Sequence, residues 1–234
     1  MTTLDGALAD LKRRGSVSLV VGSVPRESYV RVSRRMLGEA GSDPPRRRLL
    51  VVPAAERGTA IDRLRATGPL DRRHAGVIAC NGTARGAAAG TTAGDDRPPV
   101  RRIDGGLDEV GGAITDAIDR FDPGTGGFAP AELRVGIDPL PDRLGACDTR
   151  GAFAFLHAFA RQVRRADGLA HVRLPRDRDD DAVERVAPLA DALLELRLDG
   201  YRLEQRWHLR EADLVSDWIE VPDDGGTGRG GDRA

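Results

Sequence analysis

VSLVVGSVPRESYVRVSRRML, residues 17–37, is the stretch from which the fold can be worked out. Its first five residues are almost all apolar, which predicts a short buried strand. Gly22 then opens a turn. Beyond the turn, apolar residues recur at helical spacing and predict an amphipathic helix; they are Val30, Val32, Met36 and Leu37. A strand, a glycine turn and a helix in this order are the start of an α/β domain.

The same layout is typical of a phosphate-binding loop, but the chemistry of such a loop is missing. The pattern G-x-x-x-x-G-K-[ST], begun at Gly22, needs glycine, lysine and a hydroxyl residue at positions 27, 28 and 29. This chain has Glu27, Ser28 and Tyr29 there. The sequence therefore predicts the frame of a nucleotide-binding domain around a loop that lacks the means to hold a triphosphate.

Outward from this stretch, strands and helices alternate. Residues 3–14 predict an amphipathic lead-in helix, residues 48–52 a second buried strand, residues 56–65 a helix and residues 75–80 a third strand. Strands and helices that alternate at this spacing indicate βαβ units and a parallel sheet.

The second half continues the alternation and ends in a hairpin. Further helices are predicted over residues 107–121, from an Asp148 or Thr149 cap to about Ala166, and over 182–190, and strands over 133–138, 169–174, 193–198, 203–209 and 218–221. We expect Phe153, Leu156 and Phe159 on the buried face of the long helix, and a hairpin turn at Asp199-Gly200. The predicted fold is α/β, a mostly parallel sheet flanked by helices with antiparallel hairpin strands at its C-terminal end.

The predicted domain organisation is simple. Residues 1–15 form the lead-in helix, and residues 16–221 form a single domain. Within it, residues 81–99 are rich in glycine and alanine without apolar periodicity, which favours a flexible surface loop. Residues 222–234 have no core-forming side chain beyond Pro222, so we expect a disordered tail.

Composition excludes several classes of protein. The chain carries 36 basic and 37 acidic residues, a formal net charge of -1, which argues against a general polyanion-binding protein. No apolar run approaches the roughly 18 residues of a membrane span, and the N-terminus lacks the apolar core of a signal peptide. We therefore expect a cytoplasmic protein. Cys80 and Cys147 have no CxxC partner, so we expect two ordinary buried thiols.

Asp138 is the best single candidate for a functional residue. It ends the apolar strand Leu133-Arg134-Val135-Gly136-Ile137, and ligands collect outside the carboxyl ends of parallel strands, where an aspartate can place magnesium. A turn-initiating role before Pro139 explains the residue equally well. The acidic run at residues 177–181 is interpreted as a solvated loop that supplies a helix N-cap. The four histidines lack the spacing of metal ligands.

Taken together, the order of elements resembles the RecA-type ATPase core of the KaiC and archaeal RadA-paralogue group. The segments that carry this resemblance are the glycine turn at Gly22, the helix 107–121, the strand LRVGID, the helix AFAFLHAFARQVRRADG and the strand LLELRLDG. More narrowly, FLHAFARQVRRADGLAHVRL, LADALLEL and RRRLLVV are similar to uncharacterised haloarchaeal KaiC-like proteins, some of them described as transducer-like. The similarity spans residues 16–221 and is specific to the fold rather than to an activity.

The resemblance implies little catalytic inheritance. It places the phosphate-loop lysine at Ser28 and the magnesium-binding hydroxyl at Tyr29, and neither side chain can do that work. The acidic pair that activates water falls near Ala54 and Ala55, with Glu56 one position out of register. Asp138 matches the metal-side aspartate. The resemblance therefore argues against an ATPase, and against ATP and magnesium as cofactors.

Three functions follow as hypotheses. The favoured one is a non-catalytic RecA/KaiC-like module that regulates or binds another protein in signalling, with Trp207, Trp218 or the sheet edge as its interface. The second is residual nucleotide binding, through backbone amides after Gly22, the helix N-terminus at Pro25, Ser28, and Arg26 as the substitute cation. The third is association with DNA, with Arg46-Arg47-Arg48, Arg101-Arg102 and Arg164-Arg165 as the contacts. We expect a protein partner, leave a homo-oligomer open, and expect neither a membrane nor a nucleic-acid partner.

Overall fold

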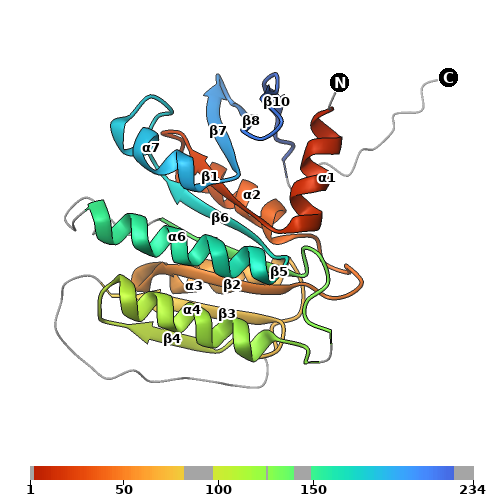
Figure 1. Ribbon diagram of the computed structural model, residues 1–234, viewed down its shortest axis with the longest axis vertical. Helices are drawn as coiled ribbons and strands as arrows, with labels where there is room; N and C mark the ends of the chain where they lie inside the picture. Colours follow the sequence, from red (N-terminus) through yellow and green to blue (C-terminus); the bar gives the residue numbers. More distant parts are fainter. Residues whose placement is uncertain (1–2, 82–96, 125, 140–148, 224–234) are drawn as a thin grey trace.

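The computed structural model describes residues 3–81, 97–124, 126–139 and 149–223. Within these residues the strands form one ten-stranded sheet in the order β10-β8-β7-β1-β6-β5-β2-β3-β4, with β9 paired to β8 (Figure 1). The strands are β1 (Ser16–Val21), β2 (Arg47–Pro53), β3 (Ala75–Cys80), β4 (Val100–Ile103), β5 (Leu133–Ile137), β6 (Leu169–Leu174), β7 (Ala192–Asp199), β8 (Arg202–Leu209), β9 (Leu214–Val215) and β10 (Ile219–Glu220).

The sheet is parallel from β7 to β4 and antiparallel only beyond β7. β1 pairs in parallel with both β6 and β7, and all six of its residues are buried, as a strand covered on both faces requires. β8 then pairs with β7, β9 and β10 in antiparallel register. The predicted fold class, a mostly parallel α/β sheet with a C-terminal hairpin, is confirmed.

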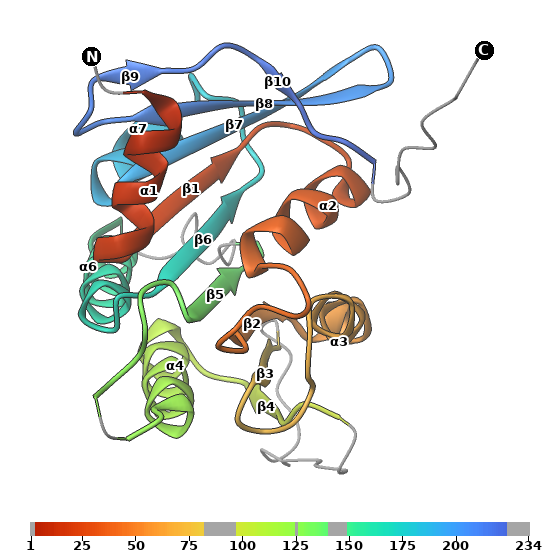
Figure 2. The same ribbon diagram turned by 90° about the vertical axis from the view of Figure 1, so that its right-hand side faces the viewer.

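Helices cover both faces of this sheet. The helices of the described residues are α1 (Leu4–Arg14), α2 (Arg26–Leu37), α3 (Arg57–Ala66), α4 (Leu107–Phe121), α6 (Thr149–Arg165) and α7 (Asp181–Val186), with short 3-10 turns η1 (Ala54–Glu56) and η2 (Ala187–Leu189). α4 and α6 share the largest core cluster on one face, while α2 and α3 pack on the other (Figure 2). α1 lies on the α2 side, over Ala192 of β7 and Leu209 of β8.

Several local predictions need correction. Two short strands are not predicted from the sequence: β4, whose four residues carry two exposed arginines between Val100 and Ile103, and the two-residue β9. Phe153 is 47% exposed, and Phe155 takes the buried position instead. Asp199 pairs with Arg202, so the hairpin loop is Gly200-Tyr201, with Gly200 at φ 59°. Cys80 is half-buried rather than buried.

Other predictions are confirmed or lie outside the described residues. α4 and β6 match their predicted bounds, and Asp180 caps α7 from the acidic run, accepting a hydrogen bond from the amide of Ala182. Most of the glycine-rich loop and of the tail, together with Cys147 and Asp148, lies outside the described residues. Among the helices of the part that is described, none combines the length and the apolar character that crossing a bilayer requires.

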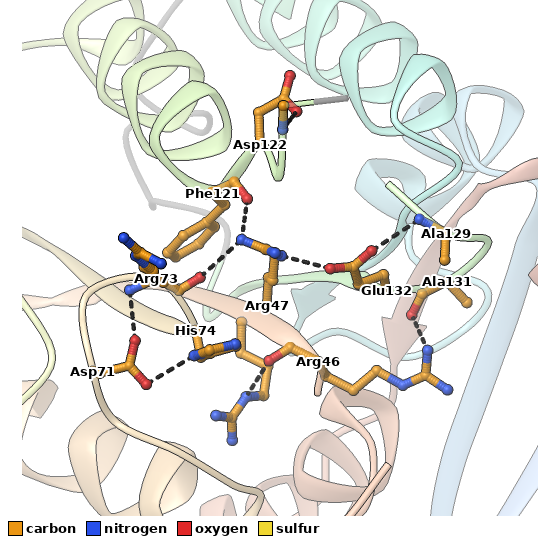
Figure 3. Close-up of polar contacts among 12 residues, drawn as sticks. Arg46, Arg47, Asp71, Arg73, His74, Phe121, Asp122, Ala129, Ala131 and Glu132 are labelled. Carbon is orange, nitrogen blue, oxygen red and sulfur yellow. Dashed lines mark hydrogen bonds and ion pairs between the residues drawn. The ribbon is translucent and has the colours of Figure 1, made fainter. Parts of the chain in front are cut away.

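Arginine side chains form ion pairs and hydrogen bonds at the amino ends of the central strands (Figure 3). Arg47, the first residue of β2, is paired with Glu132 ahead of β5 and also donates to the carbonyl oxygens of Phe121 and Arg73. The second carboxylate oxygen of Glu132 accepts the Ala129 amide at 2.9 Å. This edge of the sheet is therefore occupied by structural contacts, and the carboxyl edge is the place to look for a site.

Candidate functional site

The turn after β1 brings Gly22 against β7. Gly22 has φ 121°, and a Cβ atom there would lie 2.2 Å from the carbonyl oxygen of Leu196. The Gly22 amide donates to the carbonyl oxygen of Arg176 at 2.7 Å, and the Ser23 amide to the carboxylate of Asp177 at 3.3 Å. The glycine is thus required for close packing, and the first two amides after β1 already have acceptors within the protein.

The start of α2 holds the other residues expected to bind nucleotide. Pro25 is the N-cap and gives no side-chain hydrogen bond, and Ser28 lies half-buried in the first turn. Arg26 donates to Glu56 of η1 at 2.6 Å, with both side chains partly buried. Burial raises the pKa of Glu56, and Arg26 opposes that rise. The cation expected to replace the lysine is therefore engaged by the protein's own carboxylate.

Asp138 sits at the end of β5, where it was expected to be, but its contacts are with arginine. Arg63 of α3 donates to Oδ2 at 2.8 Å, and Arg173 of β6 donates to Oδ1 at 3.3 Å. The Arg63 and Asp138 side chains are both 0% exposed. A carboxylate that is buried without water needs such partners to stay charged. Two guanidinium groups therefore lie where a metal ion would have to approach.

A short polar chain continues from this ion pair into the core. Arg63 also donates to the Ser33 hydroxyl at 3.1 Å, and that hydroxyl lies 2.9 Å from Nε2 of His171. The Arg173 guanidinium lies over the ring of Tyr29, 4.5 Å from its centroid. α2, α3, β5 and β6 are therefore joined by one buried polar cluster, consisting of Tyr29, Ser33, Arg63, Asp138, His171 and Arg173.

Two ionisable groups of the cluster, His171 and Tyr29, have shifted pKa values. Burial, followed by the charges of Arg63 and Arg134, lowers the pKa of His171 to about 3, so its ring is neutral at pH 7. Burial, followed by the charge of Asp138, raises the pKa of Tyr29 far above its ordinary value. Neither group is able to exchange a proton near neutral pH, which a general acid or base must do. The cluster is therefore better suited to stabilising the packing of these elements than to catalysis.

Some polar atoms of the buried polar cluster lack a hydrogen-bond partner. In the described part of the chain, Nε and Nη2 of Arg63 and the Tyr29 hydroxyl are buried and find no hydrogen-bond partner. Nor does any group of three or more His, Cys, Asp or Glu side chains among those residues suit a metal ion. Asp138 as a metal ligand, and Gly22, Pro25, Arg26 and Ser28 as a nucleotide site, stay predictions, and the geometry gives each of the charged ones a protein partner instead.

Most of the cluster is not predicted from the sequence, although the sequence contains signals for it. Arg63 falls between Ala60 and Leu64 on the apolar stripe of its helix, and an arginine in that position is a buried cation that requires an acid. His171 and Arg173 are two residues apart in β6 and so share one face of that strand, while the apolar residues between and beside them face the other way. Neither signal identifies the partner, because Asp138 is distant along the chain.

The arginines weighed as DNA contacts are largely used inside the protein. Arg48 is fully buried, donates to the carbonyl oxygen of Leu64 and to the Thr67 hydroxyl, both at 2.8 Å, and has its pKa lowered by burial to about 10. Arg101 is paired with Asp116, and Arg164 with Asp191.

Comparisons with known proteins give a family and a fold. The model of a family described as "Family of unknown function (DUF7504)" matches residues 15–196. A search of curated proteins finds no match. Among solved structures, the chain is similar to the crystal structure of a KaiC-like protein from the hyperthermophilic archaeon Pyrococcus horikoshii, with 10% identity, a TM-score of 0.50, and coverage of 84% of this chain and 79% of that one. That likeness supports the KaiC-like RecA fold and nothing finer.

Proposed function

The chain belongs to the family of unknown function DUF7504, and we propose that it is a non-catalytic member of the KaiC-like fold that works in the cytoplasm as a regulatory module by binding another protein. A fold can keep its frame while the site it once carried is lost. In this chain the parallel sheet is kept, and a nucleotide site would lie at the carboxyl ends of its strands, which we call the carboxyl edge.

The main support is the pairing of charges at that edge. Phosphoryl transfer depends on cations that are free to meet phosphate oxygens and on an acid that is free to hold magnesium. Here Arg26 is bound to Glu56, Arg63 and Arg173 are bound to Asp138, and Ser28 stands in place of the lysine. Binding a triphosphate at this edge would require these pairs to break in a largely buried environment, which is costly.

A surface suited to a protein partner lies at the antiparallel end of the sheet. Four large apolar side chains of β7–β10 and the hairpin loop are exposed there: Leu198 (44%), Tyr201 (106%), Val215 (59%) and Ile219 (38%). Trp218, by contrast, is contacted by the guanidinium groups of Arg197 and Arg206, at 3.9 and 4.1 Å from its ring centroid. Leu198 and Tyr201 are both at the β7–β8 turn, whereas Val215 pairs with His208 near the other end of β8. Neighbouring exposed apolar side chains favour an interface, so Leu198 and Tyr201 are its best-suited members.

Nucleotide binding is the first test. Purified protein is titrated with ATP and with ADP in the presence of Mg²⁺ by calorimetry, at low and high salt. We expect no heat of binding at millimolar nucleotide from protein whose circular dichroism shows it to be folded. Saturable binding, abolished by Arg26→Ala and kept by Arg178→Ala at an exposed arginine, would replace this function with nucleotide binding.

One observation favours that second function. A cavity of about 470 Å³ beside α2 is lined by Arg26, Arg31 and Arg34, and the Nε atom of Arg26 has no hydrogen-bond partner among the described residues. Glu27 and Asp223 line the same cavity and weaken its appeal to an anion. The calorimetric titration separates the two functions.

The interface is tested separately. Protein carrying Leu198→Arg and Tyr201→Arg is compared with wild type for capture of proteins from the cells that produce it, and for self-association by sedimentation. We expect the double substitution to remove a specific partner, or a concentration-dependent oligomer, without loss of folding. An unchanged set of partners and an unchanged sedimentation coefficient would place the interface elsewhere.

A further inference from the structure

A cavity of about 510 Å³ lies on the α2 face of the sheet, away from the carboxyl edge. Its walls come from α1 and α2, and its floor from β1, β5, β6, β7 and β8. Figure 2 shows α1 and α2 as separate helices, with β1 and β6 visible between them. The volume falls within the roughly 300–1,000 Å³ that small-molecule sites span.

Most of the wall is apolar. Six apolar side chains from α1, α2, β7 and β8 line it: Leu8, Leu11, Val32, Met36, Leu194 and Trp207. Several of these belong to the two core clusters that α1 and α2 each build on the sheet, so the cavity lies where those clusters meet. Such a lining accommodates a hydrocarbon body rather than a sugar or a nucleotide phosphate.

The charges of the lining are mainly positive. Lys12, which is the only lysine in the chain, lines the cavity together with Arg35 and Arg134. The acidic residue in the lining, Glu220, lies 3.8 Å from Arg202, which offsets part of its charge. Arg134 is only 8% exposed and is held in place by bonds to the carbonyl oxygens of Ala131 and Met36, at 2.8 and 3.1 Å.

The floor adds small polar groups. Ser16 and Ser18 of β1 and His171 of β6 line it, each of them buried from bulk solvent. They are donors and acceptors for the polar end of a ligand, beside a cationic rim that attracts an anion. His171 also belongs to the buried polar cluster through its contact with Ser33, so a ligand in the cavity would touch a residue of that cluster.

We propose that this cavity binds a small amphipathic organic anion, a medium-chain carboxylate whose hydrocarbon tail lies against α1, α2 and Trp207 and whose carboxylate meets Lys12, Arg35 and Arg134. A cationic amphiphile of the same length is disfavoured by three basic groups against one partly neutralised acid. The cavity shares Ile219 with the exposed apolar surface of β7–β10, but Leu198 and Tyr201, the residues that test that surface, do not line it. Failure of the nucleotide or the interface proposal therefore leaves this one standing.

Trp207 provides the readout. The chain has two tryptophans, so Trp218→Phe leaves Trp207 as the sole tryptophan reporter. We expect decanoate, added below its micelle concentration, to change Trp207 fluorescence saturably. Each CH₂ buried contributes about a fourfold gain in affinity, so decanoate, with two more CH₂ groups, should bind about fifteenfold more tightly than octanoate. Decyltrimethylammonium, with the same tail and a positive head, should bind at least tenfold more weakly.

Two sets of variants test the placement. Lys12→Glu combined with Arg35→Glu should weaken decanoate binding at least tenfold, while Arg178→Glu, at an exposed arginine away from the cavity, should leave it unchanged. Ser18→Phe should block the cavity. If that variant fails to fold, the charge reversal alone decides. Equal affinity for both head groups, an unaltered affinity after charge reversal, or no saturable change would each overturn the proposal.

Discussion

Arg63 and Asp138 are the residues on which the interior of this protein most depends. Their side chains are both fully buried, and the arginine carries a second bond to Ser33. A buried ion pair contributes little over a well-packed apolar pair, but loss of one member leaves an uncompensated charge in the core. The pair therefore matters through what its absence would do.

Asp138→Asn should destabilise the fold strongly. The substitution keeps the size of the side chain and leaves Arg63 and Arg173 without their counter-charge, so we expect a loss of about 3–5 kcal/mol in the free energy of unfolding. Urea unfolding followed by circular dichroism measures it. Asp116→Asn, which removes an exposed partner of Arg101, is the matched control and should cost at most about 1 kcal/mol. Equal losses in both variants would contradict a buried pair.

His171 should make stability depend on pH. Its pKa is lowered to about 3 in the folded state from 6.5, so between these values the unfolded chain binds more protons than the folded one. The free energy of unfolding is then retained above pH 6.5 and falls as the pH drops, by about 1.4 kcal/mol per pH unit for one proton. His171→Gln cannot take up that proton. Its unfolding free energy should fall by about 2–3 kcal/mol less than wild type between pH 6.5 and 4.5.

Carboxylates elsewhere also titrate over this range, so only the difference between wild type and His171→Gln is informative. His157→Gln, at an exposed position on α6, serves as the control and should keep the wild-type profile. Parallel pH profiles for wild type and the His171 variant would show that the ring is not held neutral by its surroundings.

At the scale of elements, the β1–α2 connection decides how closely the central strand approaches its neighbour. Gly22 has φ 121°, a value that L side chains rarely adopt, and it lies against the backbone of Leu196 in β7. Gly22→Ala should therefore cost more than about 1–3 kcal/mol, since strain adds to the clash. Gly112→Ala, on an open face of α4, should be neutral or stabilising by up to about 1 kcal/mol. Thermal unfolding compares the two.

If Gly22→Ala proves as mild as Gly112→Ala, the turn must relax easily, and the glycine would then be better explained by a ligand than by packing. That outcome would revive Gly22 as part of a nucleotide site. The two readings of this glycine therefore differ in a measurable quantity, the free energy of unfolding in the absence of any ligand.

Long elements with clear periodicity were predictable, and short or charged ones were not. α4 repeats apolar residues over four turns, and β1 and β6 are apolar enough to need burial, so each was predicted within a residue of its bounds. β4 has only Val100 and Ile103 to mark it, and its pairing with β3 supplies the rest. Phe153 and Phe155 are both apolar, and only the packing against α4 decides which is buried.

The candidate site was predictable in position but not in chemistry. Asp138 and Gly22 end parallel strands, so their place at the carboxyl edge follows from the pattern. The arginine partners of Asp138 come from α3 and β6, and their convergence depends on how those elements fold together. A sequence shows that a buried cation exists, whereas its counter-charge appears only with the tertiary structure.

At the scale of the whole molecule, arginine ion pairs connect neighbouring strands and helices at both the amino and the carboxyl ends of the central strands. Arg47 fastens the amino ends of the central strands, and Arg63 and Arg173 fasten the carboxyl ends. The family match ends at residue 196, within β7, so α1 and strands β8 to β10 lie outside it. α1 nevertheless shares a core cluster with β8 through Leu11 and Leu209. This division predicts that α1 can detach while the matched core stays folded.

Leu11→Asp tests that division. Leu11 is 6% exposed and packs against Leu209 and Ala192, and burying a carboxylate among these apolar side chains is costly, so α1 should leave the sheet rather than bury the charge. Amide hydrogen exchange should then show α1 exchanging close to the rate of an unfolded peptide while β1 and β5 remain protected. Ala9→Asp, the same new charge on the exposed face of α1, should leave the helix protected. Loss of protection throughout the sheet would mean that α1 and the core unfold as one unit. Leu11 also lines the cavity, so decanoate binding should be lost from Leu11→Asp and kept by Ala9→Asp.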